Sequence, residues 1–503
     1  MKMHLNGFAA ALLLGALAGP VAGVAGAAVP VLRDINVVTR AAVDYEPLKN
    51  SIQTYINRPV TAELLQNVLN EISQYYQTRG YPGSRAFIPE QVSTDGTLKI
   101  VVMTPKIEDI VYTNQSGLKK EQFMKLFGGI EEFKGSYVNS KELDARLRPL
   151  SELGLFDIHG WFEPGQEDDG NILRLSVKKR SPFAYKLFAD NHGTKASGRY
   201  RVGAQGLVRN LTGHGDQLSG FMAHSDENQN NLALGYEIPV NSHPTVLGAG
   251  ITCGTYELGE EYEVLGAEGY SMNFELFVRE PLWRSEHAGL NLTGGVRYRR
   301  LVDKFEEFDL EFKKHTTAAY AQLDSTYFTP RWRLKGELRG TFGRLSEDDD
   351  WEIYEDEKSY GIFNLNTDFS YKFTRRLQFK NRNSIQYSPA ELESSECLQA
   401  GGPLGVRAFE SSIASGDSGV VSRLSLSWMP FADVDFAFGP GFDYAWVKNN
   451  HSDCASLSGA GMQASVGAGG FFAEATAARV VGTNYSQDER EYRVWLNIGY
   501  RQV

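Results

Sequence analysis

From about residue 182 to the C-terminus, apolar and polar residues alternate with a period of two. The segment 363–373 has phenylalanine, leucine, threonine and tyrosine at odd positions, and asparagine, aspartate, serine and lysine at even positions. The segments 377–387, 434–446 and 492–500 alternate in the same way. This period is typical of β-strands with one apolar and one polar face. The C-terminal two-thirds of the chain is therefore predicted to be antiparallel β-structure.

A soluble β-sandwich would show the same alternation, with its apolar face turned inward. Three features favour a membrane barrel instead. The apolar face is rich in aromatic residues, the segments run to about ten residues, and short connectors such as 240–245 alternate with long ones such as 388–419. Tilted strands of about ten residues cross a membrane, and short periplasmic turns alternate with long external loops in such barrels.

These features predict an all-β transmembrane barrel of about 16 antiparallel strands over residues 181–503, with a long loop at 388–418. An even strand number places both ends of the barrel on the same side of the membrane. The polar faces of the strands would then line a wet lumen.

Residues 31–180 have a different pattern, which combines helices and strands. Leu64, Val68 and Ile72 recur at helical spacing, Gly80 can end that helix, and 97–103 reads as a strand. A second run of strands and helices follows. We predict two small α/β units, at 28–106 and 107–180, each viable with a shallow core.

The N-terminus resembles a secretory signal. Lys2 precedes a long apolar stretch, and Ala25-Gly26-Ala27 suits cleavage. We therefore predict a signal peptide at 1–27. The alternative, a retained anchor helix, is less consistent with the glycine- and proline-rich second half of this apolar stretch.

Composition argues against several classes of function. The net charge of −11 makes nucleic acid an improbable partner. The acidic stretch 346–358 could bind a cation, but such charge runs are usually solvated. The stretch 415–420 is similar to the nucleophile segment of serine proteases but lacks its continuation. We predict no enzyme activity, no cofactor and no metal site.

Three motifs, in this order along the chain, carry a family resemblance. They are "YYQTRGYPGSRAFIPEQVSTDGTLKIVV" at 75–102, "GHGDQL" at 213–218 and "GGPLGVRAF" at 401–409. Together they resemble two-partner secretion transporters, the hemolysin secretion/activation proteins of the outer-membrane assembly superfamily. The resemblance covers nearly the whole mature chain and implies that 28–106 and 107–180 are POTRA domains 1 and 2.

The chain departs from the family pattern at three places. Ala408 stands where the loop signature has glycine, so the turn there must accept a Cβ atom. The C-terminal residue is Val503 rather than phenylalanine. The segment before the first POTRA domain is short, so we expect a lumen-plugging N-terminal helix to be absent or abbreviated.

The resemblance implies a lock inside the barrel. In this family the long loop folds into the lumen, and its arginine meets an acidic residue on the wall. Strand parity places Asp443 on the lumen face, so we predict an ion pair between Arg407 and Asp443. Gly402, Val406 and Phe409 flank the arginine in the signature and belong to the predicted lock. The alternative is a solvated loop arginine.

The three cysteines allow a further expectation. Cys397 and Cys454 both fall in predicted external loops, where a disulfide between them could form in an oxidising compartment. Cys253 falls within a predicted strand and is expected to be free.

The implied function is an outer-membrane transporter that recognises a large exoprotein, an adhesin or hemolysin with an N-terminal secretion domain, through its POTRA domains. Arg85 and Gln91 are the predicted recognition residues. The client would pass unfolded through the lumen without a nucleotide. Further implied partners are outer-membrane lipid and the barrel assembly machinery. The alternatives are an outer-membrane insertase of the same superfamily and a passive porin.

Overall fold

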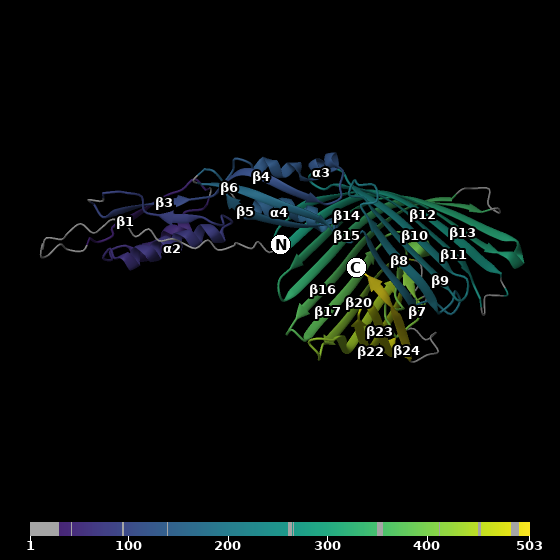
Figure 1. The fold of residues 1–503 in the computed structure, drawn as a ribbon. Coiled ribbons are helices and arrows are strands. Elements are labelled where there is room, and N and C mark those ends of the chain that lie inside the picture. Colours follow the sequence, from purple (N-terminus) through teal and green to yellow (C-terminus); the bar gives the residue numbers. More distant parts are fainter. Residues whose placement is uncertain are drawn as a thin grey trace, which may run out of the picture. The chain divides into compact units, whose positions relative to one another are not determined.

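A computed structural model describes residues 30–502 apart from 42, 93–94, 138, 168, 260–263, 265, 350–355, 412, 451–453 and 484–491 (Figure 1). The predicted signal peptide at 1–27 and the departure at Val503 lie outside the described residues. The chain forms two compact units. One comprises the residues up to 117 together with 127–180, and the other comprises 118–126 and 181–503.

The first unit begins with a three-stranded sheet in the order β1-β3-β2. Strand β3 (Thr97–Met103) is central, with β1 (Asp34–Val38) parallel and β2 (Arg85–Phe87) antiparallel to it. Helices α1 (Glu46–Ile52) and α2 (Ala62–Thr78) accompany it, with a short 3-10 turn, η1 (Gln53–Tyr55), between them.

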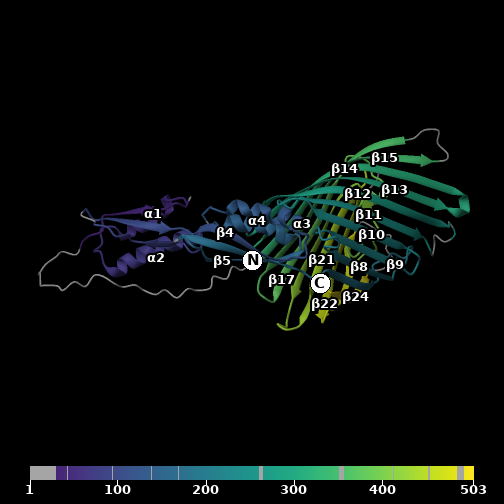
Figure 2. The ribbon, with the colours of Figure 1, turned by 45° about the horizontal axis from the view of Figure 1, so that its top comes forward.

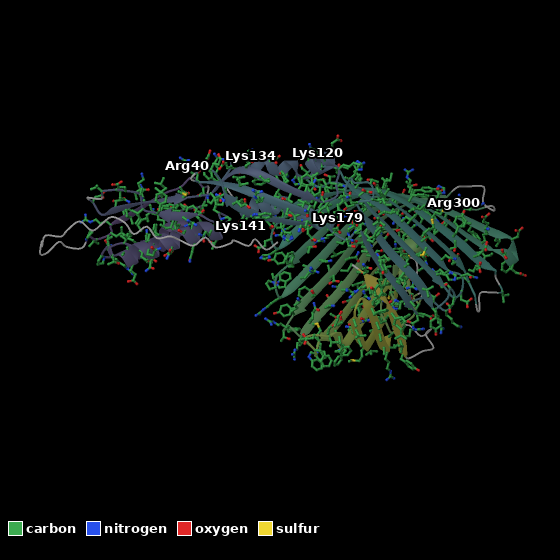
Figure 3. The ribbon with its side chains drawn as sticks, viewed as in Figure 1. Arg40, Lys120, Lys134, Lys141, Lys179 and Arg300 are labelled. Carbon is green, nitrogen blue, oxygen red and sulfur yellow. The ribbon has the colours of Figure 1, made fainter. Side chains whose placement is uncertain are left out.

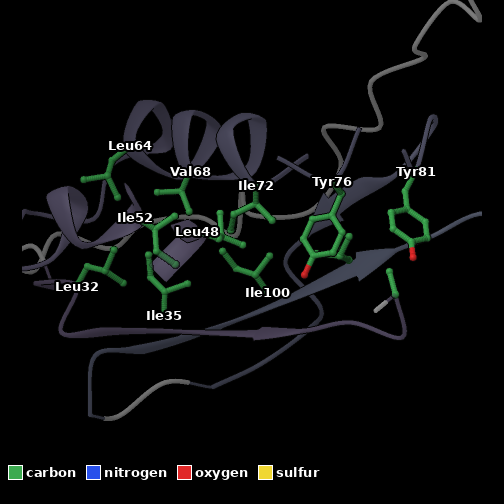
Figure 4. Packing of buried hydrophobic residues seen from close by; sticks show 12 residues of the cluster. Leu32, Ile35, Leu48, Ile52, Leu64, Val68, Ile72, Tyr76, Tyr81 and Ile100 are labelled. Carbon is green, nitrogen blue, oxygen red and sulfur yellow. The ribbon is translucent and has the colours of Figure 1, made fainter. Parts of the chain in front are cut away.

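Helix α2 forms because its apolar residues repeat at helical spacing and its start is capped. The Thr61 hydroxyl accepts a hydrogen bond from the Leu64 amide at 3.1 Å, which satisfies one of the free amides of the first turn. Leu64, Val68, Ile72 and Tyr76 are buried along one face (Figure 4). The helical prediction for this segment is confirmed.

A second sheet repeats the first. Its order is β4-β6-β5, again with one parallel and one antiparallel neighbour beside the central strand. Asn139 caps the start of helix α4 (Ser140–Glu152), because its side chain accepts hydrogen bonds from two amides of the first turn. The elements of this part of the chain are β4 (Lys106–Gln115), α3 (Lys120–Phe127), η2 (Gly128–Phe133), α4 (Ser140–Glu152), β5 (Phe156–Pro164) and β6 (Gly170–Lys179).

Charged side chains cover the surface of these α/β sheets and helices, and Figure 3 labels several of them, including Lys134 and Lys141. Lys134 Nζ lies 2.6 Å from the Asp109 carboxylate, and this hydrogen bond lowers the pKa of Asp109. Both side chains are about half exposed, so the pair adds little to the stability of the fold.

The remaining strands close into a barrel of sixteen antiparallel strands, in which the first, β7, pairs with the last, β24 (Figures 1 and 2). The predicted fold class, a sixteen-stranded barrel preceded by α/β domains, is confirmed. The barrel strands are β7 (Phe183–Asp190), β8 (Arg201–Arg209), β9 (Gln217–Ser225), β10 (Asn230–Pro239), β11 (Val246–Glu257), β12 (Ala267–Arg284), β13 (Ala288–Phe305), β14 (Leu310–Phe328), β15 (Trp332–Asp349), β16 (Asp356–Lys372), β17 (Leu377–Tyr387), β20 (Ser418–Trp428), β21 (Asp435–Lys448), β22 (Cys454–Ala468), β23 (Phe471–Thr483) and β24 (Tyr492–Gln502).

The alternation read from the sequence matches the two faces of the barrel wall. Phe363 on β16 is 60% exposed and Leu276 on β12 is 61% exposed, although both are large apolar side chains. Asp443 on β21 is only 2% exposed, and Gln386 on β17 is 7% exposed. Apolar residues point outward and many polar residues point inward, which is the reverse of a soluble sandwich.

Strands β12 to β16 contain 17 to 19 residues each, well above the roughly ten residues that are enough to cross a membrane. At about 3.3 Å per residue they are close to 60 Å long, whereas about ten tilted residues suffice to cross a bilayer. These strands therefore extend well beyond the membrane. Local alternation predicts that a strand exists but does not mark where it leaves the lipid.

Within the described part of the chain, no helix is both long enough and apolar enough to cross a membrane.

The orientation of the two faces predicts opposite tolerances to charge. Leu276→Arg on the outer face of β12 should destabilise the barrel by about 2–4 kcal/mol if it lies near the bilayer midplane, because the guanidinium meets hydrocarbon. Thr252→Arg, on the inner face of the neighbouring strand β11, should cost much less. Reversible unfolding in lipid vesicles measures both, and equal losses would contradict the assignment of faces.

Candidate functional site

The connector between β17 and β20 folds back into the barrel as a hairpin. It contains a 3-10 turn, η5 (Ser394–Glu396), and a two-stranded ladder of β18 (Leu398–Gln399) with β19 (Ser415–Gly416). Side chains of this loop contact the inner faces of strands on both sides of the lumen. We call residues 388–399 the first arm and residues 400–414 the tip.

Arg407 at the tip forms a two-pronged ion pair with Asp443 on β21. The Nε and Nη2 atoms of Arg407 each lie 2.8 Å from one carboxylate oxygen of Asp443. The backbone amide of Arg407 also donates to that carboxylate, at 3.1 Å. The fork geometry of guanidinium suits this arrangement, and three charge-assisted hydrogen bonds fix the position of the tip.

Two further side chains hold Arg407. Its Nη1 donates to Oε1 of Gln463 on β22 at 2.9 Å, and its carbonyl oxygen accepts from Nε1 of Trp495 on β24 at 2.7 Å. Neither residue belongs to the predicted lock. Both interrupt an otherwise regular face, because Gln463 follows two inward glycines and Trp495 is an aromatic residue on a polar face. In the sequence, each of these two residues could have been noticed as differing in kind from its neighbours on the inward face of its strand.

Apolar packing completes the seat of the tip. Val406, Ala408 and Phe409 are fully buried, and they pack in one cluster with residues of β20 to β23. Gly402 has a φ of +89°, which favours glycine, and its amide donates to the carbonyl of Phe409 at 3.1 Å. The structure thus brings the predicted residues Gly402, Val406, Arg407, Phe409 and Asp443 together.

Ala408, which replaces the glycine of the family signature, fits because the wall beneath it lacks side chains. A Cβ atom added to Gly459 on β22 would lie 2.6 Å from the Cβ of Ala408. A Cβ atom added to Gly441 on β21 would lie 2.6 Å from Nη2 of Arg407. Two wall glycines therefore provide the space that the tip occupies.

The surroundings of the pair are polar and charged. A hollow of about 250 Å³ beside the guanidinium is lined by Arg382, Arg423, Gln463 and Glu474, among others. Nη1 of Arg423 on β20 donates to the carbonyl of Pro403 at 2.7 Å. The guanidinium of the tip therefore has polar surroundings, whereas the apolar side chains of the tip pack in the cluster described above.

Cys397 and Cys454 are both free thiols in the structure, so the expected disulfide between them is not formed. Sγ of Cys397 instead lies 3.8 Å from the Asp417 carboxylate and 3.7 Å from the carbonyl of Glu393. Burial, together with the Asp417 and Glu393 carboxylates, raises the pKa of the Cys397 thiol to about 12. Cys253, within β11, is also free.

The two predicted recognition residues have different surroundings. Arg85 is exposed on the short edge strand β2. The Gln91 side chain donates to the carbonyl of Lys99 at 2.8 Å and accepts from its amide at 2.9 Å, so it extends the sheet beside β3. Gln91 therefore shapes the edge of the sheet, whereas Arg85 is available to a partner.

Across the described ranges, no group of histidine, cysteine, aspartate or glutamate side chains could hold a metal ion.

Comparisons with known proteins agree with this architecture. The family model "Haemolysin secretion/activation protein ShlB/FhaC/HecB" matches residues 169–469, and the model "POTRA domain, ShlB-type" matches residues 31–104. The heme/hemopexin transporter protein HuxB of Haemophilus influenzae is 22% identical over 481 residues, which cover 90% of this chain and 83% of that protein. The outer membrane transporter CdiB of Dickeya dadantii is 22% identical over 74% of this chain and 68% of its own length.

Solved structures show the same fold. CdiB from Escherichia coli superposes with a TM-score of 0.74 at 19% identity, covering 97% of this chain and 93% of that one. BamA from Haemophilus ducreyi lacking POTRA domains 1–3 gives a TM-score of 0.55 at 13% identity, covering 94% of this chain and all of that one.

The surroundings of the cysteines predict unequal reactivity. In the folded barrel, the exposed Cys454 should react with a maleimide at least tenfold faster than Cys397, because the thiolate is the reactive form and the pKa of Cys397 is raised. Mass spectrometry of timed samples measures both rates. Equal rates, or a Cys397–Cys454 crosslink in the absence of reductant, would contradict the structure.

The fit between Ala408 and Gly459 predicts a reversible clash. Gly459→Ala should displace the tip and destabilise the barrel by about 1–3 kcal/mol, a typical cost of overpacking. Adding Ala408→Gly should restore wild-type behaviour, because the double variant again has a single methyl group at this contact, now on β22 instead of on the tip. Gly250→Ala on the inner face of β11 is a matched control, because the nearest neighbouring atom would lie 3.8 Å from the added Cβ.

Limited proteolysis of the loop reports displacement of the tip, and the free energy of unfolding reports the loss of stability. If Gly459→Ala behaved like the Gly250→Ala control, the contact would not position the tip.

Proposed function

Because this chain belongs to the haemolysin secretion/activation protein family, a family of two-partner secretion transporters of the outer membrane, we propose that it exports a large polypeptide in an unfolded state and that the loop locked by Arg407 and Asp443 gates the passage. The α/β domains then lie in the periplasm, and the barrel spans the outer membrane. The family is one of transporters and not of enzymes.

One observation carries the gating proposal: the tip lies inside the barrel and is held there by a buried ion pair. Asp443 is 2% exposed, and the guanidinium of Arg407 meets both of its carboxylate oxygens. A polypeptide that passes through the lumen must displace a loop anchored in this way. Separating the two charges leaves an unpaired carboxylate in a confined space, so the closed state is favoured until a client competes for it.

The first POTRA domain supplies a docking edge for that client. Strand β2 contains only three residues and lies at the edge of its sheet, where its outer side has no strand partner among the described residues. An extended segment of the client can add a strand there, with backbone hydrogen bonds for affinity and the exposed Arg85 for selectivity. The client is a large exoprotein, an adhesin or hemolysin with an N-terminal secretion domain.

The names of two relatives are consistent with a client of this kind. HuxB is described as a heme/hemopexin transporter protein, and HpmB of Proteus mirabilis as a hemolysin transporter protein. Folding of the client outside the cell drives export in this proposal, since the sequence contains no nucleotide fingerprint. Outer-membrane lipid surrounds the barrel, and the barrel assembly machinery inserts it.

A second candidate is an assembly factor that inserts other barrels into the outer membrane. The fold likeness to BamA favours it, but at 13% identity this likeness concerns the fold alone. Deletion of the gene separates the two. Loss of a transporter removes one large polypeptide from the medium and leaves it retained or degraded in the periplasm, whereas loss of an assembly factor depletes many outer-membrane proteins. A passive porin would show neither effect and would conduct steadily.

The lock predicts a specific secretion defect. Arg407→Ala and Asp443→Ala should each reduce export by about tenfold or more while the barrel still inserts, because removing one partner strands the other charge and frees the tip. Arg382→Ala is a matched control, since Arg382 is also an inward-facing arginine but pairs with Asp368 at an exposed site.

Export is measured by immunoblotting of the client in the medium, and insertion by heat-modifiable mobility. Normal export by Arg407→Ala, or an equal loss in Arg382→Ala, would refute the lock.

A further inference from the structure

We infer that Glu396, clasped by Arg297 and Arg299, fixes the first arm of the loop to the wall formed by β13 to β17, so that only the tip moves when the Arg407–Asp443 pair opens. The inference rests on the proposed gating function and adds to it a fixed part and a moving part. The three residues act by positioning the loop.

The clasp consists of one carboxylate and two guanidinium groups. Oε1 of Glu396 accepts from Nη2 of Arg297 at 2.5 Å and lies 3.2 Å from Nη1 of Arg299. Arg297 and Arg299 are two residues apart on β13, so their side chains point to the same face of the strand. The side chains are 9%, 14% and 16% exposed for Glu396, Arg297 and Arg299, so solvent screens these interactions weakly.

The turn that carries Glu396 is held by its neighbours as well. Oγ of Ser395 accepts from Nη1 of Arg299 at 2.5 Å. The side-chain amide of Gln386 on β17 donates to the carbonyls of Glu396, at 2.9 Å, and Asp417, at 3.2 Å. The η5 turn is thus attached to β13 through charges and to β17 through an amide.

Apolar packing supports the same arm. Leu392 is buried in a small cluster with Tyr360 and Ile362 of β16, and Ala390 and Cys397 pack against it. The first arm therefore covers the inner wall from β13 to β17.

A third attachment holds the base of the arm. The buried Asp417 accepts from the amide of Leu392 and from the amide of Asn450, both at 2.8 Å. The Asn450 side chain donates to the carbonyl of Ala390 at 2.7 Å. This network joins both ends of the loop to the connector that follows β21.

The tip depends on a different set of residues. The side chain of Arg407 takes Asp443 and Gln463 as partners, so its withdrawal releases contacts to β21 and β22 together. Hydrogen bonds from Arg423, Trp495 and Arg493 hold the tip to β20 and β24. The ladder that joins the two parts contains only two residue pairs. The first arm is attached to the wall at three separate places. The β18–β19 ladder, which joins the arm to the tip, is short enough to act as a hinge.

Two crosslinked variants test the inference, in a background in which Cys253, Cys397 and Cys454 are replaced by serine. Leu392→Cys with Ile362→Cys ties the first arm to β16. Val406→Cys with Leu457→Cys ties the tip to β22, because both residues belong to one buried cluster. Each single-cysteine variant is the control for its pair, and loss of free thiols shows that the bond has formed.

Export through the oxidised arm variant should stay within twofold of its reduced form, because the arm does not move. Export through the oxidised tip variant should fall at least tenfold and recover on reduction. A reversible block by the arm crosslink would overturn the inference while leaving the gating proposal intact. Unchanged export by the tip crosslink would overturn the gating proposal itself.

Glu396→Gln gives a second measurement, the frequency of spontaneous openings in single-channel recordings. Releasing the arm should raise this frequency at least fivefold, and the oxidised Leu392–Ile362 crosslink should restore the wild-type value. A general folding role for Glu396 does not account for rescue by a crosslink elsewhere in the arm. Unchanged openings, or openings that the crosslink fails to suppress, would refute the positioning role.

Discussion

The architecture depends on the hydrogen bonds that close the sheet between its first and last strands. Tyr185–Asp190 of β7 pair with Asn497–Gln502 of β24, which leaves the sheet without a free edge. In hydrocarbon an unpaired backbone amide or carbonyl costs several kcal/mol, so a sheet can span a membrane only when closed. Closure also gives each strand one face toward the lumen and one face toward lipid. Because side chains alternate along a strand, every second residue contacts lipid and the others line the lumen.

The closed wall changes the role of a long loop. A loop in open solvent would contribute little through one arginine, because exposed ion pairs are weak. Inside the lumen, the carboxylate of Asp443 is shielded from water and meets the guanidinium of Arg407, which Gln463 also holds, while Trp495 binds the carbonyl of Arg407. The same residue types therefore form a strong attachment, and different strands of the wall hold the tip and the first arm of the loop.

Much of this arrangement could be predicted from local pattern. The period-two alternation predicts the barrel strands, helical spacing at Leu64, Val68 and Ile72 predicts α2, and parity places Asp443 on the inner face of the barrel. The pairing of Arg407 with Asp443 required more, since it came from a resemblance to a family and not from periodicity. Strand ends were less predictable, because alternation continues in β12 to β16 beyond the lipid.

The sequence by itself determined which side chains face lipid and which face the lumen, because a strand turns its residues alternately to two sides whatever surrounds it. Only the tertiary structure decided which inward residues meet. Glu396 lies 99 residues from Arg297, and Arg407 lies 88 residues from Trp495, so these contacts depend on how the loop crosses the closed barrel. The same inward fold left Cys397 beside Asp417 and not bonded to Cys454, since the path of a loop is set by the walls that hold it and not by its own composition.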